Sequence, residues 1–188
     1  MEPESALRSP RTPTLEAYAD TIVPGEKRWP GDAAIAGAAD GGGAVAAGAI
    51  QLLEWDATGL TEGLDDLADL LNRHARTYAD GRGLALDTAL PPFVALDFGH
   101  RTALVAELTA PGHPEKEFWV LLALFSNMAY DSAAHMHTAD AIAQGHPGLA
   151  AMGVVPPGPD RLWRFDQHSY GRRLARVHPD TTPSGSPA

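Results

Sequence analysis

The chain has 188 residues, of which 44% are hydrophobic, and it carries a formal net charge of −10. This length and composition predict one domain with a substantial buried core. The acidic charge argues against nucleic acid and anionic membranes as partners, because both repel it. The absence of cysteine excludes disulfides, thiolate nucleophiles and cysteine-ligated metals.

Residues 1–13 contain several Pro, Ser and Arg residues and show no hydrophobic periodicity, so we expect them to be disordered. Arg8 and Arg11 are not followed by the run of about 7–15 apolar residues that a signal peptide needs. No segment approaches the ~20 apolar residues of a membrane span. The sequence therefore predicts a cytoplasmic protein with no signal peptide.

The first half of the predicted domain contains four helical patterns. They cover residues 14–23, 33–39, 44–57 and 60–80. The pattern at 60–80 is the clearest, because one apolar stripe recurs at steps of three and four residues through Leu60, Leu64, Leu67, Leu71, His74 and Tyr78. Thr14 and Thr61 stand where side chains cap helix N-termini, and we expect them to cap the first and fourth helices.

Two helices are predicted in the second half. Asp97 is placed to cap a helix over 98–110. The segment 115–134 is apolar almost all round in its middle part, which is typical of a helix in the centre of a domain. No strand pattern and no repeat interrupts this series. We predict an all-α single domain over 14–177, an irregular bundle of about five main helices around 115–134, followed by a disordered tail over 178–188.

Two carboxylate–histidine pairs stand at helical spacing in these two helices. Asp131 and His135 are four residues apart, and Asp97 and His100 are three apart, so the members of each pair are expected to share a helix face. Paired carboxylates and histidines in a bundle core are typical of di-iron proteins. The chain lacks the Glu-x-x-His motif of that class and has too few inward carboxylates, so we predict no di-metal site.

The pair His135 and His137 allows two readings. On a helix their side chains point about 200° apart and cannot bind one ion. In an extended segment they would share a face and could form a mononuclear metal site with His146 or Asp131. The other reading is that both are loop residues and that Thr138 caps a new helix. We assign no metal ligand.

A metal-free acid–base site is a further possibility at the same place. Tyr130, Asp131 and His135 combine a phenol, an orienting carboxylate and a base, and His100 is a possible fourth member. Histidine is the side chain best suited to proton transfer near neutral pH. The structural alternative is that Asp131 only hydrogen-bonds His135 at a helix C-terminus.

The segment 160–176 mixes arginines with aromatic residues in an otherwise acidic chain. Trp163, Arg164, Tyr170 and Arg172 are of the types that anchor protein–protein interfaces. They are our candidates for a partner interface. The alternative is a solvated C-terminal helix.

One motif resembles a known family. In "LEAYADTIVPGEKRWPGDAAIAGA", residues 15–38, a helix ends in Asp-Thr-Ile-Val-Pro-Gly and a second Pro-Gly follows. This is similar to the small-subunit family of gluconate 2-dehydrogenase (subunit 3), and in particular to its short actinobacterial relatives. The stretch "GLAAMGVVPPGP" is similar to the Leu-Gly-Tyr-Pro-Gly ending of that family, with Val154 in place of the tyrosine. The resemblance covers residues 14–160.

The resemblance implies a small subunit that accompanies a large flavin-dependent oxidoreductase of the glucose–methanol–choline class. FAD and the catalytic histidine would belong to the partner, and this chain would bind no cofactor. Many members carry a twin-arginine signal, from which this chain departs. The motif residues Asp20, Thr21, Pro24 and Gly25 transfer as loop-forming residues, with Asp20 and Thr21 satisfying backbone groups of the Pro-Gly turn.

Two functions are therefore expected from the sequence. The first is a non-catalytic, stabilising partner subunit of a flavoprotein oxidoreductase, without nucleic acid or membrane partners. The alternative is a small α-helical enzyme of specialised metabolism that uses the acid–base group around His135.

Overall fold

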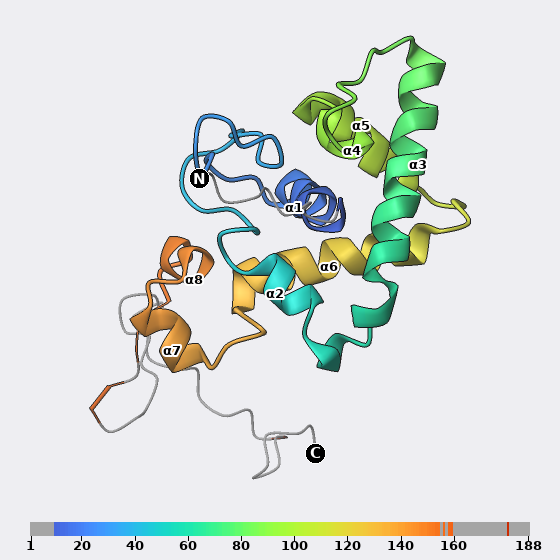
Figure 1. Cartoon of the computed structure of the whole chain (residues 1–188). Helices are drawn as coiled ribbons and strands as arrows, with labels where there is room; N and C mark the ends of the chain where they lie inside the picture. Colours follow the sequence, from blue (N-terminus) through green and yellow to red (C-terminus); the bar gives the residue numbers. More distant parts are fainter. Residues whose placement is uncertain (1–9, 155, 157, 160–179, 181–188) are drawn as a thin grey trace, which may run out of the picture. The chain divides into compact units, whose positions relative to one another are not determined.

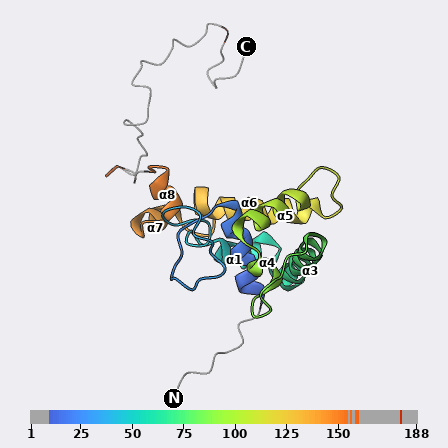
Figure 2. The ribbon, with the colours of Figure 1, turned by 90° about the horizontal axis from the view of Figure 1, so that it is seen from above.

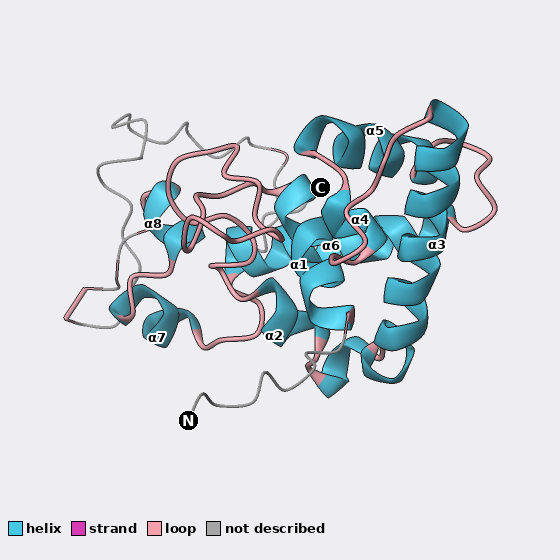
Figure 3. Cartoon of the chain, turned by 45° about the horizontal axis from the view of Figure 1, so that its top comes forward, coloured by secondary structure: helices cyan, strands magenta, loops and turns pink. Residues whose placement is uncertain are grey.

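The computed structural model describes residues 10–154, 156, 158, 159 and 180. Within these residues the chain forms helices joined by loops and no β-strand, which confirms the predicted all-α class (Figure 3). The helices are α1 (Arg11–Ile22), α2 (Ala49–Leu53), α3 (Leu64–Arg82), α4 (Pro92–Ala95), α5 (Phe98–Leu108), α6 (Lys116–Ser132), α7 (Thr138–Ala143) and α8 (Pro147–Ala151). No helix of this part is long and apolar enough to cross a membrane. The compact unit that holds these helices ends at Val154, and the predicted domain end at 177 lies outside the described residues.

Helix α6 is the central element, as its apolar sequence predicts. It contacts α1, α2, α5 and α8, and Figure 1 shows α1 and α2 lying close to it. Figure 2 shows α8 near one end of α6 and α5 near the other. The buried stripe of α6 is formed by Trp119, Leu122, Ser126 and Ala129. Their 3-4-3 spacing places all four on one side of the helix.

Aromatic side chains from three elements meet in the main core. Tyr18 of α1 lies between Phe93 of α4 and Trp119 of α6, with ring centroids 6.3 Å and 6.2 Å away. The Tyr18 hydroxyl donates a hydrogen bond to the Trp119 carbonyl at 2.6 Å. Burial raises the pKa of this phenol, so it stays a neutral donor. The contacts fix α1 and α4 against the central helix.

Helix α1 begins earlier than predicted, so the expectation of disorder for 1–13 is wrong for residues 11–13. Pro13 is tolerated in the first turn, where backbone N–H groups have no helical partner. Thr14 is not the cap but a buried residue inside the helix, whose hydroxyl donates to the Pro10 carbonyl at 2.7 Å. The same hydroxyl accepts from Asn72 Nδ2 at 3.0 Å, and Asn72 Oδ1 accepts from the Phe93 N–H. Asn72 thereby joins α1, α3 and α4.

The two helices predicted at 33–39 and 44–57 are largely absent. Residues 33–39 form no helix, and only α2 and a short 3₁₀ turn, Asp56–Thr58, occupy the second range. Gly37 and Gly48 have φ of 73° and 90°, in the left-handed region that interrupts a right-handed helix. The alanines of this region thus pack as loop residues.

Helix α3 confirms the predicted apolar stripe and corrects its start. It begins at Leu64, and the preceding 3₁₀ turn Thr61–Gly63 contains the residue predicted as the cap. Thr61 Oγ1 makes no capping bond and is buried without a hydrogen-bond partner. The helix continues to Arg82 and ends at Gly83, which adopts the left-handed conformation typical of a C-terminal cap.

Candidate functional site

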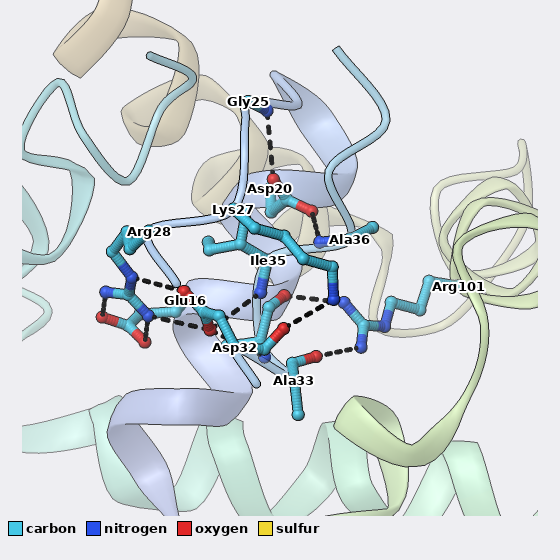
Figure 4. Close-up of polar contacts among 11 residues, drawn as sticks. Glu16, Asp20, Gly25, Lys27, Arg28, Asp32, Ala33, Ile35, Ala36 and Arg101 are labelled. Atoms are coloured by element: carbon cyan, nitrogen blue, oxygen red, sulfur yellow. Dashed lines mark hydrogen bonds and ion pairs between the residues drawn. The ribbon is translucent and has the colours of Figure 1, made fainter. Parts of the chain in front are cut away.

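The motif that resembles a known family, residues 15–38, is called the family-like motif. It runs from α1 into a loop, and Asp20 holds this loop by hydrogen bonds at two points. Asp20 is 1% exposed. Its Oδ1 accepts from the Gly25 N–H at 3.2 Å and its Oδ2 from the Ala36 N–H at 2.9 Å (Figure 4). The predicted role of Asp20 in the Pro-Gly turn is confirmed. The prediction for Thr21 is wrong, because its hydroxyl donates to the Ala17 carbonyl within α1.

Gly25 is required in this loop for space. A Cβ added there would lie 2.3 Å from the Gly43 nitrogen. The two chain segments are also joined by hydrogen bonds, from the Glu26 N–H to the Gly41 carbonyl and from the Ala44 N–H to the Val23 carbonyl. The motif is therefore a site of close backbone contact between two loops.

Arg101 of α5 holds the same loop from the other side and is 3% exposed. Its guanidinium donates to the carbonyls of Ala33, Ala34, Val94 and Leu96, at 2.6–2.9 Å. Figure 4 shows the bond to Ala33. Burial lowers the pKa of Arg101 and raises that of Asp20, against the attraction between the two charges. All four of these guanidinium bonds go to backbone, which is typical of a structural residue.

A second arginine ties the outer end of the loop. Arg28 Nε donates to Asp32 Oδ2 at 2.6 Å, and its terminal nitrogens donate to both carboxylate oxygens of Glu16 (Figure 4). Burial acts to raise the pKa of Asp32, but Arg28 and the N–H groups of Ile35 and Ala34 lower it overall. Asp32 thus stays ionised within the loop.

The structure does not assemble the predicted acid–base group. Helix α6 ends at Ser132 and Ala133 turns into the left-handed conformation, so the predicted i, i+4 face shared by Asp131 and His135 is wrong. Asp131 is exposed and accepts from Asn127 Nδ2 at 2.8 Å.

The other two members of the predicted acid–base group, His100 and Tyr130, lie in different surroundings. His100 of α5 lies beside Tyr78 of α3, with 3.1 Å between His100 Nδ1 and the phenol oxygen. Asp97 is the N-cap of α5, as predicted, and accepts from the His100 N–H at 2.8 Å. Among the described residues, the Tyr130 side chain makes no hydrogen bond to His100, Asp131 or His135. Its carbonyl lies against α8, where a Cβ on Gly148 would be 1.8 Å from it.

His135 lines a pocket of about 380 Å³, together with Gly48, Gln51, Gln144 and His146. Its ring covers Gly48, where an added Cβ would lie 2.3 Å from His135 Nε2. His135 Nδ1 is buried without a hydrogen-bond partner. His146, by contrast, uses both nitrogens: Nε2 donates to the Ala47 carbonyl and Nδ1 accepts from the Leu149 N–H. These two bonds fix the orientation of the His146 ring.

The mononuclear metal reading receives no support from the neighbouring histidine. His137 is exposed and is the N-cap residue of α7 without a side-chain capping bond. Thr138, predicted as the cap, is the first helical residue. His137 is therefore a loop residue, as the second reading expected.

His135 should make the stability of the protein depend on pH. Burial lowers its pKa, and the nearby His146 adds to this effect. As pH falls below the ordinary histidine pKa of about 6.5, the unfolded chain takes up the proton before the folded chain does. The stability contributed by neutral His135 is thus present above this pH and is lost as pH falls toward the lowered folded pKa. We expect His135→Gln to reduce the loss of unfolding free energy between about pH 7.5 and about pH 5.5, which lie on either side of that value.

Urea unfolding at the two pH values measures this effect. His137→Gln is the matched control, since it removes an exposed histidine two positions away. Equal pH dependence in wild type and His135→Gln would show that His135 does not titrate with folding.

Three residues that the sequence reasoning missed form a separate polar cluster. The ligand atoms of His74, His113 and Glu115 lie within 4.8 Å of one another, and His74 Nε2 is 2.7 Å from Glu115 Oε2. Burial acts to raise the pKa of Glu115, but His74 lowers it overall. His74 was visible in the sequence as a polar residue on the apolar stripe of α3, which is the signal that could have drawn attention to it.

Helix α6 also carries an exposed apolar surface. Its outer face, defined as Phe118, Val120, Leu121 and Leu124, contains three side chains that are 53%, 42% and 50% exposed, with Leu121 half-buried. The prediction of a central helix is therefore correct for one side of α6 only. A groove of about 380 Å³ adjoins this face and is lined by Phe118 and by Leu60, Leu67 and Leu70. The predicted interface residues Trp163, Arg164, Tyr170 and Arg172 lie outside the described residues.

Comparison with known proteins gives one result that concerns the whole chain. Residues 9–188 match the model of a protein family described as "Family of unknown function (DUF5987)". Neither the curated proteins nor the solved structures gave a match. Because the family match spans nearly the full sequence, the chain belongs to this family, DUF5987.

Proposed function

We propose that this protein is a non-catalytic partner subunit that stabilises a large flavin-dependent oxidoreductase of the glucose–methanol–choline class. The partner holds FAD, and the proposed location of the complex is the cytoplasm. The observation that carries the proposal is the outer face of α6, which leaves large apolar side chains in solvent on the central helix of the fold. The resemblance of the 15–38 motif to small subunits of such oxidoreductases supports this choice of partner.

The outer face has the character of a protein-binding surface. Phe118, Leu121 and Leu124 follow one another at three-residue steps, so their side chains are neighbours on the helix. The adjoining groove adds Leu67 and Leu70 of α3, and Leu60, which precedes the 3₁₀ turn Thr61–Gly63. Contiguous apolar surface of this kind marks sites of association in soluble proteins.

The polar parts of the described structure support an accessory role. Arg101 and Asp20 form hydrogen bonds with backbone groups of the family-like loop. That loop is thereby fixed in shape. A fold held by such bonds suits a subunit with a preformed docking surface elsewhere, because a preformed surface loses less entropy on binding.

Substitution of Leu124 by Asp tests the docking surface. It places a charge on the outer face, where burial by a partner would leave that charge unpaired. We expect binding to the flavoprotein to weaken by about 2 kcal/mol, which is about 30-fold in Kd. The experiment co-expresses the full chain with a glucose–methanol–choline flavoprotein encoded next to it in its genome, and follows co-elution by flavin absorbance.

Ala106→Asp is the matched control, because Ala106 is an exposed residue of α5 and the change of charge is the same. Both variants should unfold at the temperature of the wild type. Co-elution that is lost only with Leu124→Asp supports the proposal. A flavoprotein that folds, binds FAD and elutes alone regardless of this chain contradicts it, and unchanged binding of Leu124→Asp contradicts the assigned surface.

A further inference from the structure

The cluster of His74, His113 and Glu115 has the composition and spacing of a metal-binding group. It brings together one residue of α3 and two residues that immediately precede α6, and their ligand atoms lie within 4.8 Å of one another. We propose that these two imidazoles and this carboxylate bind one divalent transition-metal ion of the Zn²⁺ type. This proposal goes beyond the partner-subunit function and does not depend on it.

Local contacts hold the three side chains toward one another. His74 Nε2 is 2.7 Å from Glu115 Oε2, and His113 Nδ1 accepts from the Glu115 N–H at 3.2 Å. The imidazole rings of His74 and His113 meet edge to face with centroids 5.8 Å apart. An ion between the three groups would replace the His74–Glu115 hydrogen bond. Each imidazole would bind it through a deprotonated nitrogen, and His113 Nδ1 would no longer accept from the Glu115 N–H.

Trp119 supplies the surroundings that a metal ligand needs. Its ring packs edge-on against His74 at 5.8 Å, and fixes the orientation of that imidazole. Its Nε1 is buried and has no hydrogen-bond partner among the described residues. Neighbouring groups that fix the orientation of a ligand side chain strengthen metal binding.

The donor set selects the class of ion. Two nitrogens and one oxygen suit Zn²⁺ and similar transition metals, whereas Ca²⁺ and Mg²⁺ prefer oxygen alone. His74 and Glu115 remain 28% and 29% exposed, so water can complete the coordination. Three protein ligands with an open position are a common arrangement for Zn²⁺. The ion would cross-link α3 to the start of α6.

Isothermal titration of the metal-free full chain with Zn²⁺ tests the site, on protein without an affinity tag. We expect one ion per chain and a higher unfolding temperature with Zn²⁺ present. His113→Gln and Glu115→Gln should each weaken binding by at least about tenfold, since loss of an outer-shell partner alone typically costs about 10–100-fold. His137→Gln, which removes an exposed histidine outside the cluster, should bind as the wild type does.

The metal-free unfolding temperature of each variant separates loss of binding from loss of fold. Glu115→Gln keeps the shape of the side chain and tests the ligand charge. Binding of Co²⁺ gives a second readout through its visible absorption, which should disappear in His113→Gln. The proposal is overturned if the folded wild type binds less than one Zn²⁺ per chain, or if the two cluster variants bind it as tightly as His137→Gln does.

Discussion

Arg101→Met is expected to lower the free energy of unfolding by about 3–5 kcal/mol, the range typical of removing one partner from a buried charged network. The guanidinium donates to the carbonyls of Ala33, Ala34, Val94 and Leu96. Methionine fills similar space but donates nothing, so buried carbonyls lose their partners. The substitution also leaves Asp20 without its nearby positive charge. Urea denaturation followed by circular dichroism measures the loss.

Arg76→Met is the matched control, because Arg76 lies on the exposed side of α3. Its loss should change stability by no more than about 0.5 kcal/mol. A loss below about 1 kcal/mol for Arg101→Met would mean that the carbonyls find other donors, and that Arg101 does not hold the loop.

Gly25→Ala is the second substitution with a large expected effect. The added Cβ would lie 2.3 Å from the Gly43 nitrogen and 2.9 Å from its Cα, and both belong to backbone that cannot rotate away. The two loops must separate, which should cost about 1–3 kcal/mol or more of unfolding free energy. Because Gly25 has no positive φ, the effect isolates crowding from backbone strain. Thermal and urea unfolding measure it.

Gly81→Ala provides a control of opposite sign. Gly81 lies within α3 and an added Cβ meets nothing within 4 Å. Gly81 lies in the last turn of α3, so alanine there should stabilise the protein by at most about 0.5–1 kcal/mol, the gain typical of a helix interior. If Gly25→Ala is as stable as the wild type, the loops of the motif are not in close contact in solution.

The helices that repeat a 3-4 pattern were predictable from the sequence, and the loop between them was not. The apolar stripe of α3, the central α6 and the cap at Asp97 depend on residues close in sequence, so local patterns suffice. The stretch 33–48 is rich in alanine, which favours a helix. Its structure is decided instead by left-handed glycines and by distant partners such as Arg101, which no local pattern contains.

In the candidate sites too, the features that depend on distant residues could not be predicted from local patterns. The predicted pair of Asp131 and His135 assumed that the helix continues, but Ala133 ends it with a positive φ that alanine rarely adopts. The cluster around Glu115 depends on His74, which is 41 residues away. The spacing of residues in the sequence reveals neither where α6 ends nor that His74 lies beside Glu115. His74 alone gave a signal, as a polar side chain on an apolar stripe.

Hydrogen bonds join segments of this fold that lie far apart in the sequence. The bond from Arg101 to the Ala34 carbonyl spans 67 residues and the bond from Asn72 to Thr14 spans 58, separations at which many proteins place a disulfide. The chain contains no cysteine. Its cross-links therefore form and break reversibly as the protein folds, and thiol oxidation or reduction leaves them unchanged.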